Sequence, residues 1–386
     1  MKADIRLNRA LARLIAVQVC IHACMAGIRM AAPLLALRQG YSPASVGLLL
    51  ALFSLTSVFL SLPAGRFADS HSQKRPVAIS VGFTVFGAGL AVVWPIFPVL
   101  CVSALLTGGS TGSALIALQR HVGRMASDKT QLKQVFSWLA MGPAISNFVG
   151  PFFAGLMIDH AGFRAAFALM AVLPLASWFM VRNTPELPKE RRTENTDRLR
   201  VWDLLADPKM RRLLLINWIL SSCWDVHTFV LPVLGHERGF SASVIGTILG
   251  LFAVAATVVR VLMSLLASRV QEWAVIMTAM AATALLFGIY PLLHSPLLMG
   301  LCSIMLGFSL GSVQPMILST LHQITPVHRH GEALGLRMMS INASSVVMPM
   351  LFGTAGAVVG VAGVFWAVGA TVAGGTRVAW RLKAKA

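Results

Sequence analysis

The most informative residues of this chain are polar side chains that stand inside long apolar stretches. Gln18, His22 and Arg29 follow one another at i, i+4 and i+11, so a helix would place all three on one face. A guanidinium, an imidazole and an amide on one face suit the binding of an anion or the exchange of a proton. Because ionisable groups in apolar segments are costly, each is a hypothesis of function by default.

A second polar face lies about 200 residues further on. It holds Asn217, Ser221, Trp224, Asp225 and Thr228. Asp225 is the one acid that we place deep in an apolar run, and it is our leading candidate for binding and releasing a proton. We predict that Arg29 and Asp225 approach each other or share a bound molecule. A purely structural ion pair that holds two helices together is the alternative.

Other polar residues in apolar runs are weaker candidates. His22 and His227 are second choices for proton exchange, and for His227 a hydrogen-bonded packing role is an equal alternative. Arg260 shares a helical face with Thr257 and Ser264, which suits contact with an anion or with a helix end. Gln314 adds a neutral polar group, and Trp224 offers an apolar wall.

The composition says what kind of element must position these residues. Of the 386 residues, 56% are hydrophobic and 12% are charged, yet the formal net charge is +18. The mean hydropathy is +0.75. A chain this apolar has too few polar side chains to cover the surface of a water-soluble protein. This argues against a soluble enzyme. A nucleic-acid binder needs a polar basic face, whereas most of this chain lies in apolar runs. The composition therefore predicts a polytopic membrane protein.

Apolar stretches of about 20 residues, long enough to cross a bilayer as helices, recur along the chain. We predict twelve spans, at about residues 12–36, 43–64, 76–97, 99–119, 135–157, 164–182, 212–234, 242–267, 273–293, 296–320, 333–352 and 355–376. No cleavable signal peptide is expected, because the first apolar run has no convincing cleavage site and is long enough to span.

The basic residues indicate how the spans are oriented. With the N-terminus in the cytoplasm, 26 of the 32 Lys and Arg residues fall on the cytoplasmic side. Three lie in external loops, and Arg29, Arg260 and Arg337 lie inside spans. This asymmetry follows the positive-inside rule, so both termini are expected in the cytoplasm. The basic clusters are then signals of orientation and lipid contact rather than of nucleic-acid binding.

The chain is predicted to consist of two similar halves. A polar segment at 183–211 separates a six-helix bundle at 1–182 from a second one at 212–386. At a shift of 199 residues, many Gly, Pro, Ser and aromatic residues of the first half fall on like residues of the second, including Pro33 on Pro232, Gly40 on Gly239, Phe53 on Phe252, Gly108 on Gly307 and Gly112 on Gly311. Because six spans separate the copies, the repeats are parallel, as in transporters that bind substrate between two halves.

A loop motif follows the second span, with the sequence Gly65-Arg66-Phe67-Ala68-Asp69-Ser70-His71-Ser72-Gln73-Lys74-Arg75. Its Asp69 is expected to pair with a basic group or a helix N-terminus nearby. The motif closely resembles the G-x-L-A-D-R-x-G-R-R/K loop of the major facilitator superfamily. That resemblance implies a gate latch at Gly65, Asp69 and Arg75. For Arg337, about a turn inside the eleventh span, we favour a role at the same gate over contact with an anionic substrate.

A second resemblance lies in the fifth span. Residues 146–155 are similar to the antiporter motif G-x-x-x-G-P-x-x-G-G, with Gly150, Pro151 and Gly155 matching, which implies similarity to the 12-span drug:proton antiporters. Ordinary close packing of small residues is an equally good interpretation. Residues 159–164 resemble the superfamily's D-x-x-G-W/F-R turn. The fourth-span motif with an intramembrane Arg, present in many proton-coupled members, is missing.

These observations predict a secondary transporter of the bacterial inner membrane, a monomer that works by alternating access, and not an enzyme. Proton-coupled export of a small molecule is the first hypothesis. Symport or exchange of an organic anion through the intramembrane arginines is the alternative, and a non-transporting sensor on the same fold is a third. The sequence holds no metal-ligand cluster, nucleophile elbow or phosphate-binding loop, so no metal or cofactor is expected. The five cysteines lie within predicted spans, so no disulfide framework is expected.

Overall fold

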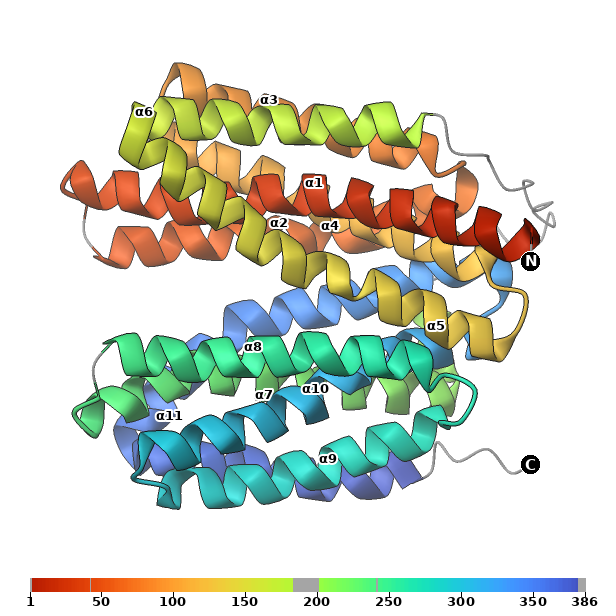
Figure 1. The fold of residues 1–386 in the computed structure, drawn as a ribbon, viewed down its shortest axis with the longest axis vertical. Helices are drawn as coiled ribbons and strands as arrows, with labels where there is room; N and C mark the ends of the chain where they lie inside the picture. Colours follow the sequence, from red (N-terminus) through yellow and green to blue (C-terminus); the bar gives the residue numbers. More distant parts are fainter. Residues whose placement is uncertain (1, 42, 183–200, 241, 381–386) are drawn as a thin grey trace. The chain divides into compact units, whose positions relative to one another are not determined.

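The structure is a computed structural model that describes residues 2–41, 43–182, 201–240 and 242–380. The side chains of 2–8, 43, 44, 229, 232, 236, 242, 243, 246 and 349–358 also lie outside the description. Residues 183–200 of the predicted linker lie outside the description as well. Every regular element of the described chain is a helix, which confirms the predicted all-α class (Figure 1).

The helices follow one another along the chain with short connections. They are α1 Lys2–Arg38, α2 Pro43–Ser70, α3 Lys74–Val93, α4 Phe97–Met125, α5 Lys129–Leu139, α6 Met141–Val181, α7 Pro208–Glu237, α8 Ala242–Leu265, α9 Glu272–Ile289, α10 Pro296–Ile324 and α11 His330–Trp380. Three short 3-10 helices join them, η2 Val201–Ala206, η3 Tyr290–Leu292 and η4 Val327–Arg329.

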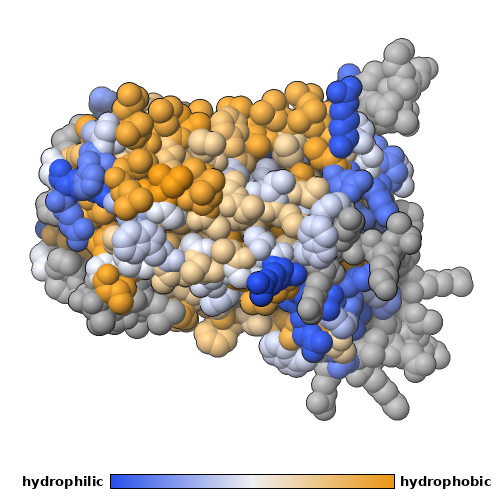
Figure 2. All heavy atoms as spheres, turned by 90° about the horizontal axis from the view of Figure 1, so that it is seen from below, coloured by the Kyte–Doolittle hydropathy of each residue, from blue (hydrophilic) through white to orange (hydrophobic). Residues whose placement is uncertain are grey.

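Ten helical stretches of the described residues are long and apolar enough to cross a membrane. One of them, 129–181, contains the fifth and sixth predicted spans, which are joined without a loop. Gly162 divides α6 with a φ of 82°, and Gly360 divides α11 with a φ of 74°. Since only glycine adopts such φ values readily, each of these two residues forms a non-helical kink between two helices. In Figure 2, hydrophobic side chains cover the middle of the visible face and hydrophilic ones gather toward the helix ends.

The described chain forms two compact units. Unit 1 holds residues 1–127, 139–201 and 325–343, and unit 2 holds 128–138, 202–324 and 344–386. Compared with the predicted halves, each unit has gained one short segment from the other half of the sequence. These segments are the beginning of α11 in unit 1 and all of α5 except Leu139 in unit 2.

Equivalent contacts recur in the two units at the shift of 199 residues. Thr84 hydrogen-bonds Ser110 at 2.7 Å in unit 1, and Thr283 hydrogen-bonds Ser309 at 3.2 Å in unit 2. Gly108 lies against the backbone of Phe53, and Gly307 lies against the backbone of Phe252. Gln39 donates to the Pro95 carbonyl, and its equivalent Arg238 donates to the Pro291 carbonyl, three residues before the equivalent of Pro95. The sequence repeat is therefore also a repeat of contacts.

Small residues bring α6 against α1 in unit 1. Gly150 lies against the backbone of Ala23 and Gly27, and the Ser146 hydroxyl donates to the Val19 carbonyl at 3.2 Å. Gly155 is opposite Met30. The half of α6 that carries the antiporter-like motif thus runs parallel to α1, with Gly150 at the closest approach. This is the geometry that small residues allow between membrane helices.

Replacing Gly150 with leucine is expected to destabilise unit 1, because the new side chain would collide with the Ala23 carbonyl. Overpacking of this kind costs about 1–3 kcal/mol. The measurement is the thermal unfolding midpoint of the purified protein in detergent. Gly82→Leu on α3 is the matched control, since open space surrounds Gly82. Equal losses in the two variants would contradict this account of the packing.

Candidate functional site

The Asp69 carboxylate at the end of α2 caps the first turn of α11. Its Oδ1 accepts the backbone N–H of Gly331 at 2.8 Å, and its Oδ2 accepts the N–H of Glu332 at 2.9 Å. The first amides of a helix lack partners within the helix and carry its positive dipole end, so a carboxylate there is favourable. Asp69 therefore contacts the helix N-terminus that the sequence predicts.

The second predicted partner of Asp69, a basic group, is Arg120 on α4. The Arg120 Nε lies 2.6 Å from Asp69 Oδ1, and its Nη2 lies 3.4 Å from the Asp69 carbonyl oxygen. Both side chains are about nine-tenths buried. A buried charge without its partner is strongly unfavourable, so Asp69 and Arg120 are mutually dependent. The sequence analysis missed Arg120, which it counted among the basic residues that mark orientation.

Two further features bring α2 and α11 together. Gly65 and Gly331 approach each other backbone to backbone, and a side chain on either would collide with the other's carbonyl. Glu332 pairs with Arg66 at 3.1 Å and with Arg329 at 2.7 Å. We call the set Gly65, Asp69, Arg120, Gly331 and Glu332 the Asp69 latch.

The other two residues of the predicted gate have different surroundings. Arg75 is exposed at the start of α3 and makes no ion pair with any described residue. Arg337 lies two turns into α11 and is 1% exposed, with Nη1 4.0 Å from the Met338 sulfur. The basic residues that pair with acids of the latch are Arg120, Arg66 and Arg329. The gate roles of Arg75 and Arg337 remain predictions.

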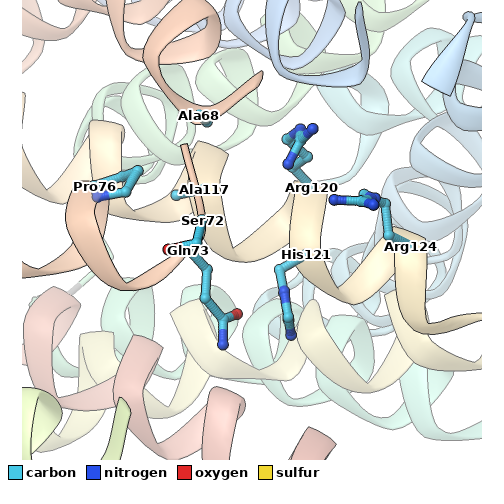
Figure 3. A pocket seen from close by; sticks show the side chains of 8 residues that line it. All are labelled: Ala68, Ser72, Gln73, Pro76, Ala117, Arg120, His121 and Arg124. Carbon is cyan, nitrogen blue, oxygen red and sulfur yellow. The ribbon is translucent and has the colours of Figure 1, made fainter. Parts of the chain in front are cut away.

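A small polar pocket adjoins the latch (Figure 3). It is lined by Ala68, Ser72, Gln73, Pro76, Ala117, Arg120, His121 and Arg124. Arg120 and His121 are neighbours on α4, Arg124 lies one turn later, and the space holds roughly one water molecule. Water can therefore reach the Arg120 side of the latch.

Unit 2 has a contact at the equivalent place, with different chemistry. Lys133 on α5, which corresponds to Glu332 at the shift of 199, donates from Nζ to the Val270 carbonyl at 2.7 Å. Lys133 is 7% exposed, and one turn later the ring of Phe136 contacts His322 at 4.8 Å. The second half lacks the Gly and Asp of the loop motif at 264–268. A lysine on the helix and a carbonyl on the loop take their place.

The predicted polar face of α1 exists in unit 1. Gln18 is 4% exposed beside Gly142, and the His22 ring lies near the Asn147 side chain of α6. Arg29 is exposed on the same face, although its neighbours Gly27 and Ile28 are buried. The motif helix α6 thus supplies a polar partner to this face, which the sequence analysis did not foresee.

The predicted polar face of α7 lies in unit 2. Asp225 is 9% exposed and accepts the Ser344 hydroxyl at 3.3 Å. The Trp224 ring contacts Phe252 edge-on at 4.6 Å, and the Arg260 guanidinium lies 5.9 Å from its centre. Arg260 and Asn217 are buried, and Gln314 on α10 is half-buried. Because Arg29 belongs to unit 1 and Asp225 to unit 2, their approach stays a prediction.

His227 packs inside unit 2. Its Nε2 hydrogen-bonds the Ser303 hydroxyl at 2.9 Å, and Ser303 hydrogen-bonds the Tyr290 hydroxyl at 2.7 Å. The imidazole stacks on Phe252 at 4.2 Å and is fully buried. These contacts favour the packing interpretation of His227. Among the described residues, no three His, Cys, Asp or Glu side chains gather as metal ligands would.

Comparison with known proteins places the chain among transporters. The family model described as Major Facilitator Superfamily matches residues 14–321 and 213–384. The chain is 23% identical over 223 residues to a probable sugar efflux transporter of Haemophilus influenzae (strain 86-028NP), a match that covers 55% of this chain and 54% of that protein. It thus spans about half the length of that relative. It is 23% identical over 330 residues to multidrug resistance protein 1 of Bacillus subtilis (strain 168), covering 81% and 80%.

Two solved structures have a similar fold. A bacterial homologue of the iron transporter ferroportin, in its outward-facing state, matches with a TM-score of 0.82 and 15% identity over 97% of this chain and 99% of that one. The human organic anion transporter MFSD10 (TETRAN) matches with a TM-score of 0.79 and 16% identity over 96% and 99%. At these identities the likeness extends to the fold alone.

Weakening the Asp69 latch is expected to separate the end of α2 from the start of α11. In Asp69→Asn or Arg120→Gln, charged hydrogen bonds worth about 1.5–3 kcal/mol each are lost. Spin labels at Ser70 and Val327, in a background without native cysteines, should then report longer and broader distances. Arg75→Gln is the matched control and should leave the distances unchanged. A shift in Arg75→Gln equal to that in Arg120→Gln would contradict this assignment.

The Lys133 contact is expected to hold the start of α5 in unit 2. Lys133→Met removes the donor to the Val270 carbonyl, so the first turns of α5 should detach more often. A cysteine at the buried position 137, introduced as Ser137→Cys, should then react faster with a maleimide. Lys129→Met, which changes an exposed lysine one turn earlier, should leave the rate unchanged. Equal maleimide reaction rates in the wild-type, Lys133→Met and Lys129→Met backgrounds would contradict the claim that Lys133 holds α5 in place.

Proposed function

The chain belongs to the Major Facilitator Superfamily, and on this premise we propose that it exports a small molecule in exchange for protons by alternating access. As a member of this superfamily it is a secondary transporter of the membrane, not an enzyme. The finer proposal places it in a bacterial inner membrane as a monomer, with both termini in the cytoplasm. Export is supported by the names of its distant relatives, a probable sugar efflux transporter and a multidrug resistance protein.

The proposal of proton coupling rests on the position and surroundings of Asp225. It lies 17 residues beyond Pro208, where α7 begins, and is 9% exposed within unit 2. The Ser344 hydroxyl donates to it, and Ser222 hydrogen-bonds Ser344 at 3.2 Å. A carboxylate on a membrane helix is costly when charged, so a change in its surroundings alters how readily it holds a proton. In our proposal Asp225 binds a proton from one side and releases it to the other.

The latches supply the mechanical part of the proposal. The Asp69 latch and the Lys133 contact hold α11 and α5 at the cytoplasmic ends of the helices. Opening toward the cytoplasm breaks the carboxylate–amide hydrogen bonds of Asp69 and the bond of Lys133. Substrate binding at the polar faces of α1 and α7 then has to stabilise the open state. The free energy gained must be as large as that by which the Asp69 latch and the Lys133 contact stabilise the closed state.

Symport or exchange of an organic anion is the second candidate function. It is favoured by Arg29, Arg260 and Arg337, three arginines in membrane helices, against the single acid Asp225. The two candidates differ in the direction of proton movement. In antiport, substrate and proton cross in opposite directions, whereas in symport they cross together.

The test of the proposed function uses vesicles with an imposed pH gradient. Adding ethidium or 1-naphthoate as probe should dissipate the gradient in wild type, because export draws protons across. Asp225→Asn should abolish this response, since the side chain can no longer exchange a proton. Asp203→Asn, an exposed acid in η2, is the matched control. A full response in Asp225→Asn would refute coupling through Asp225, and probe movement in the proton's direction would favour symport.

A further inference from the structure

We infer that the small polar pocket beside the Asp69 latch binds one small inorganic anion of about the size of chloride. The pocket lies within unit 1, where the start of α3 meets the end of α4 (Figure 3). A bound anion there goes beyond the proposed function, because the pocket is formed by helix ends and not by the polar faces of α1 and α7.

Positive charge and hydrogen-bond donors dominate the lining of this pocket. The polar groups are two guanidinium groups, an imidazole, a hydroxyl and a carboxamide, from Arg120, Arg124, His121, Ser72 and Gln73. None of the described residues that line the pocket is acidic. Arg124 and Ser72 are half-buried, so ions of the aqueous phase reach the pocket. Space for roughly one water molecule suits a single small ion better than a phosphate group.

His121 lacks a hydrogen-bond partner at this pocket. Its side chain lines the pocket and is 7% exposed, and none of the described residues forms a hydrogen bond with it. The corresponding residue of unit 2, Thr320, donates to the Met316 carbonyl of its own helix. A buried imidazole N–H without an acceptor is costly. A ligand in the pocket that accepts a hydrogen bond from His121 removes this cost.

The start of α3 adds the electric field of a helix N-terminus. α3 has 20 residues, its N-cap Gln73 forms no side-chain capping hydrogen bond, and its first turn holds no acid. The first amides of a helix carry its positive dipole end and bind anions readily. Asp69 balances the charge of Arg120, and Arg124 and the helix start supply further positive charge. The combined field favours an anion over a water molecule.

Unit 2 holds a carboxylate of the chain itself at the equivalent place. At the shift of 199 residues, the equivalent pairs are Gln73 with Glu272, Arg120 with Ser319 and Arg124 with Gln323. Glu272 lies in the first turn of α9, and its carboxylate accepts the Ser319 hydroxyl at 3.0 Å and the Gln323 amide at 2.8 Å. In unit 2 an anion thus joins the start of α9 to α10.

The register of the helices supports this equivalence. Thr84 of α3 hydrogen-bonds Ser110 of α4, and Thr283 of α9 hydrogen-bonds Ser309 of α10. The starts of α3 and α9 therefore meet corresponding turns of α4 and α10. Unit 2 places a carboxylate among neutral donors, whereas unit 1 places a neutral carboxamide among cationic donors. An anion from solution supplies in unit 1 the charge that Glu272 supplies in unit 2.

The experiment measures the thermal unfolding midpoint of the purified full chain in detergent while chloride replaces gluconate at constant ionic strength. Gluconate is the reference because it is too large for the pocket. We expect the midpoint to rise by about 2 °C and then to saturate as chloride increases, because a ligand that binds only the folded state stabilises it. Equal midpoints in gluconate and chloride would overturn the inference.

Substitutions then locate the site. Gln73→Glu gives unit 1 the carboxylate that unit 2 has. Its midpoint in gluconate should be at least as high as that of the wild type saturated with chloride, and chloride should raise it no further. Arg124→Gln introduces the side chain that unit 2 has at this position, and it should weaken the apparent chloride affinity about tenfold. His121→Leu removes a donor and should weaken this affinity about fivefold.

Arg75→Gln is the matched control. Arg75 is exposed near the pocket but does not line it, so the variant loses the same charge and should keep the chloride affinity of the wild type. If Arg75→Gln weakens chloride as much as Arg124→Gln does, the effect is general charge screening and the site is refuted. If chloride raises the midpoint of Gln73→Glu as much as that of the wild type, the anion binds elsewhere. Each variant is compared with itself in the two salts, so a less stable variant still reports chloride binding.

Discussion

Two backbone amides and one guanidinium converge on the Asp69 carboxylate, and this contact joins the end of α2 to the beginning of α11 within unit 1. The amides belong to Gly331 and Glu332, and the guanidinium belongs to Arg120. Because all three donors carry positive charge or the positive end of a helix dipole, one acid satisfies three otherwise costly groups. Gly65 and Gly331 follow from the same constraint, since the carboxylate reaches the amides only when the two backbones nearly touch.

The repeat shows how the same place can be held by different chemistry. In unit 1 the end of α2 supplies the anion, Asp69, and α11 supplies the amide donors. In unit 2 the helix α5 supplies the donor, Lys133, and the loop before α9 supplies a carbonyl. The difference in chemistry is local, because the packing contacts around it, such as Thr84 with Ser110 and Thr283 with Ser309, are repeated.

Much of the fold was predictable, because span length, basic-residue asymmetry and the shift of 199 residues are properties of the sequence. The type of partner for Asp69 was also predictable, since a carboxylate at a helix end seeks positive charge. Which basic residue would be that partner was not predictable. Arg120 is one of many basic residues near helix ends, and only the register of α2 against α4 selects it. Lys133 and Asn147 were missed for the same reason, whereas the turn motif at 159–164 coincides with the kink at Gly162 that divides α6.

The most direct test of the central claim is hydrogen–deuterium exchange at the backbone amides of Gly331 and Glu332. The account predicts slow exchange in the wild-type protein, because both amides donate to a buried carboxylate. In Asp69→Asn, exchange at these two amides should become much faster, while that of the next turn changes little. Fast exchange in the wild type, or equal rates in wild type and variant, would contradict the claim that Asp69 holds α11 against α2.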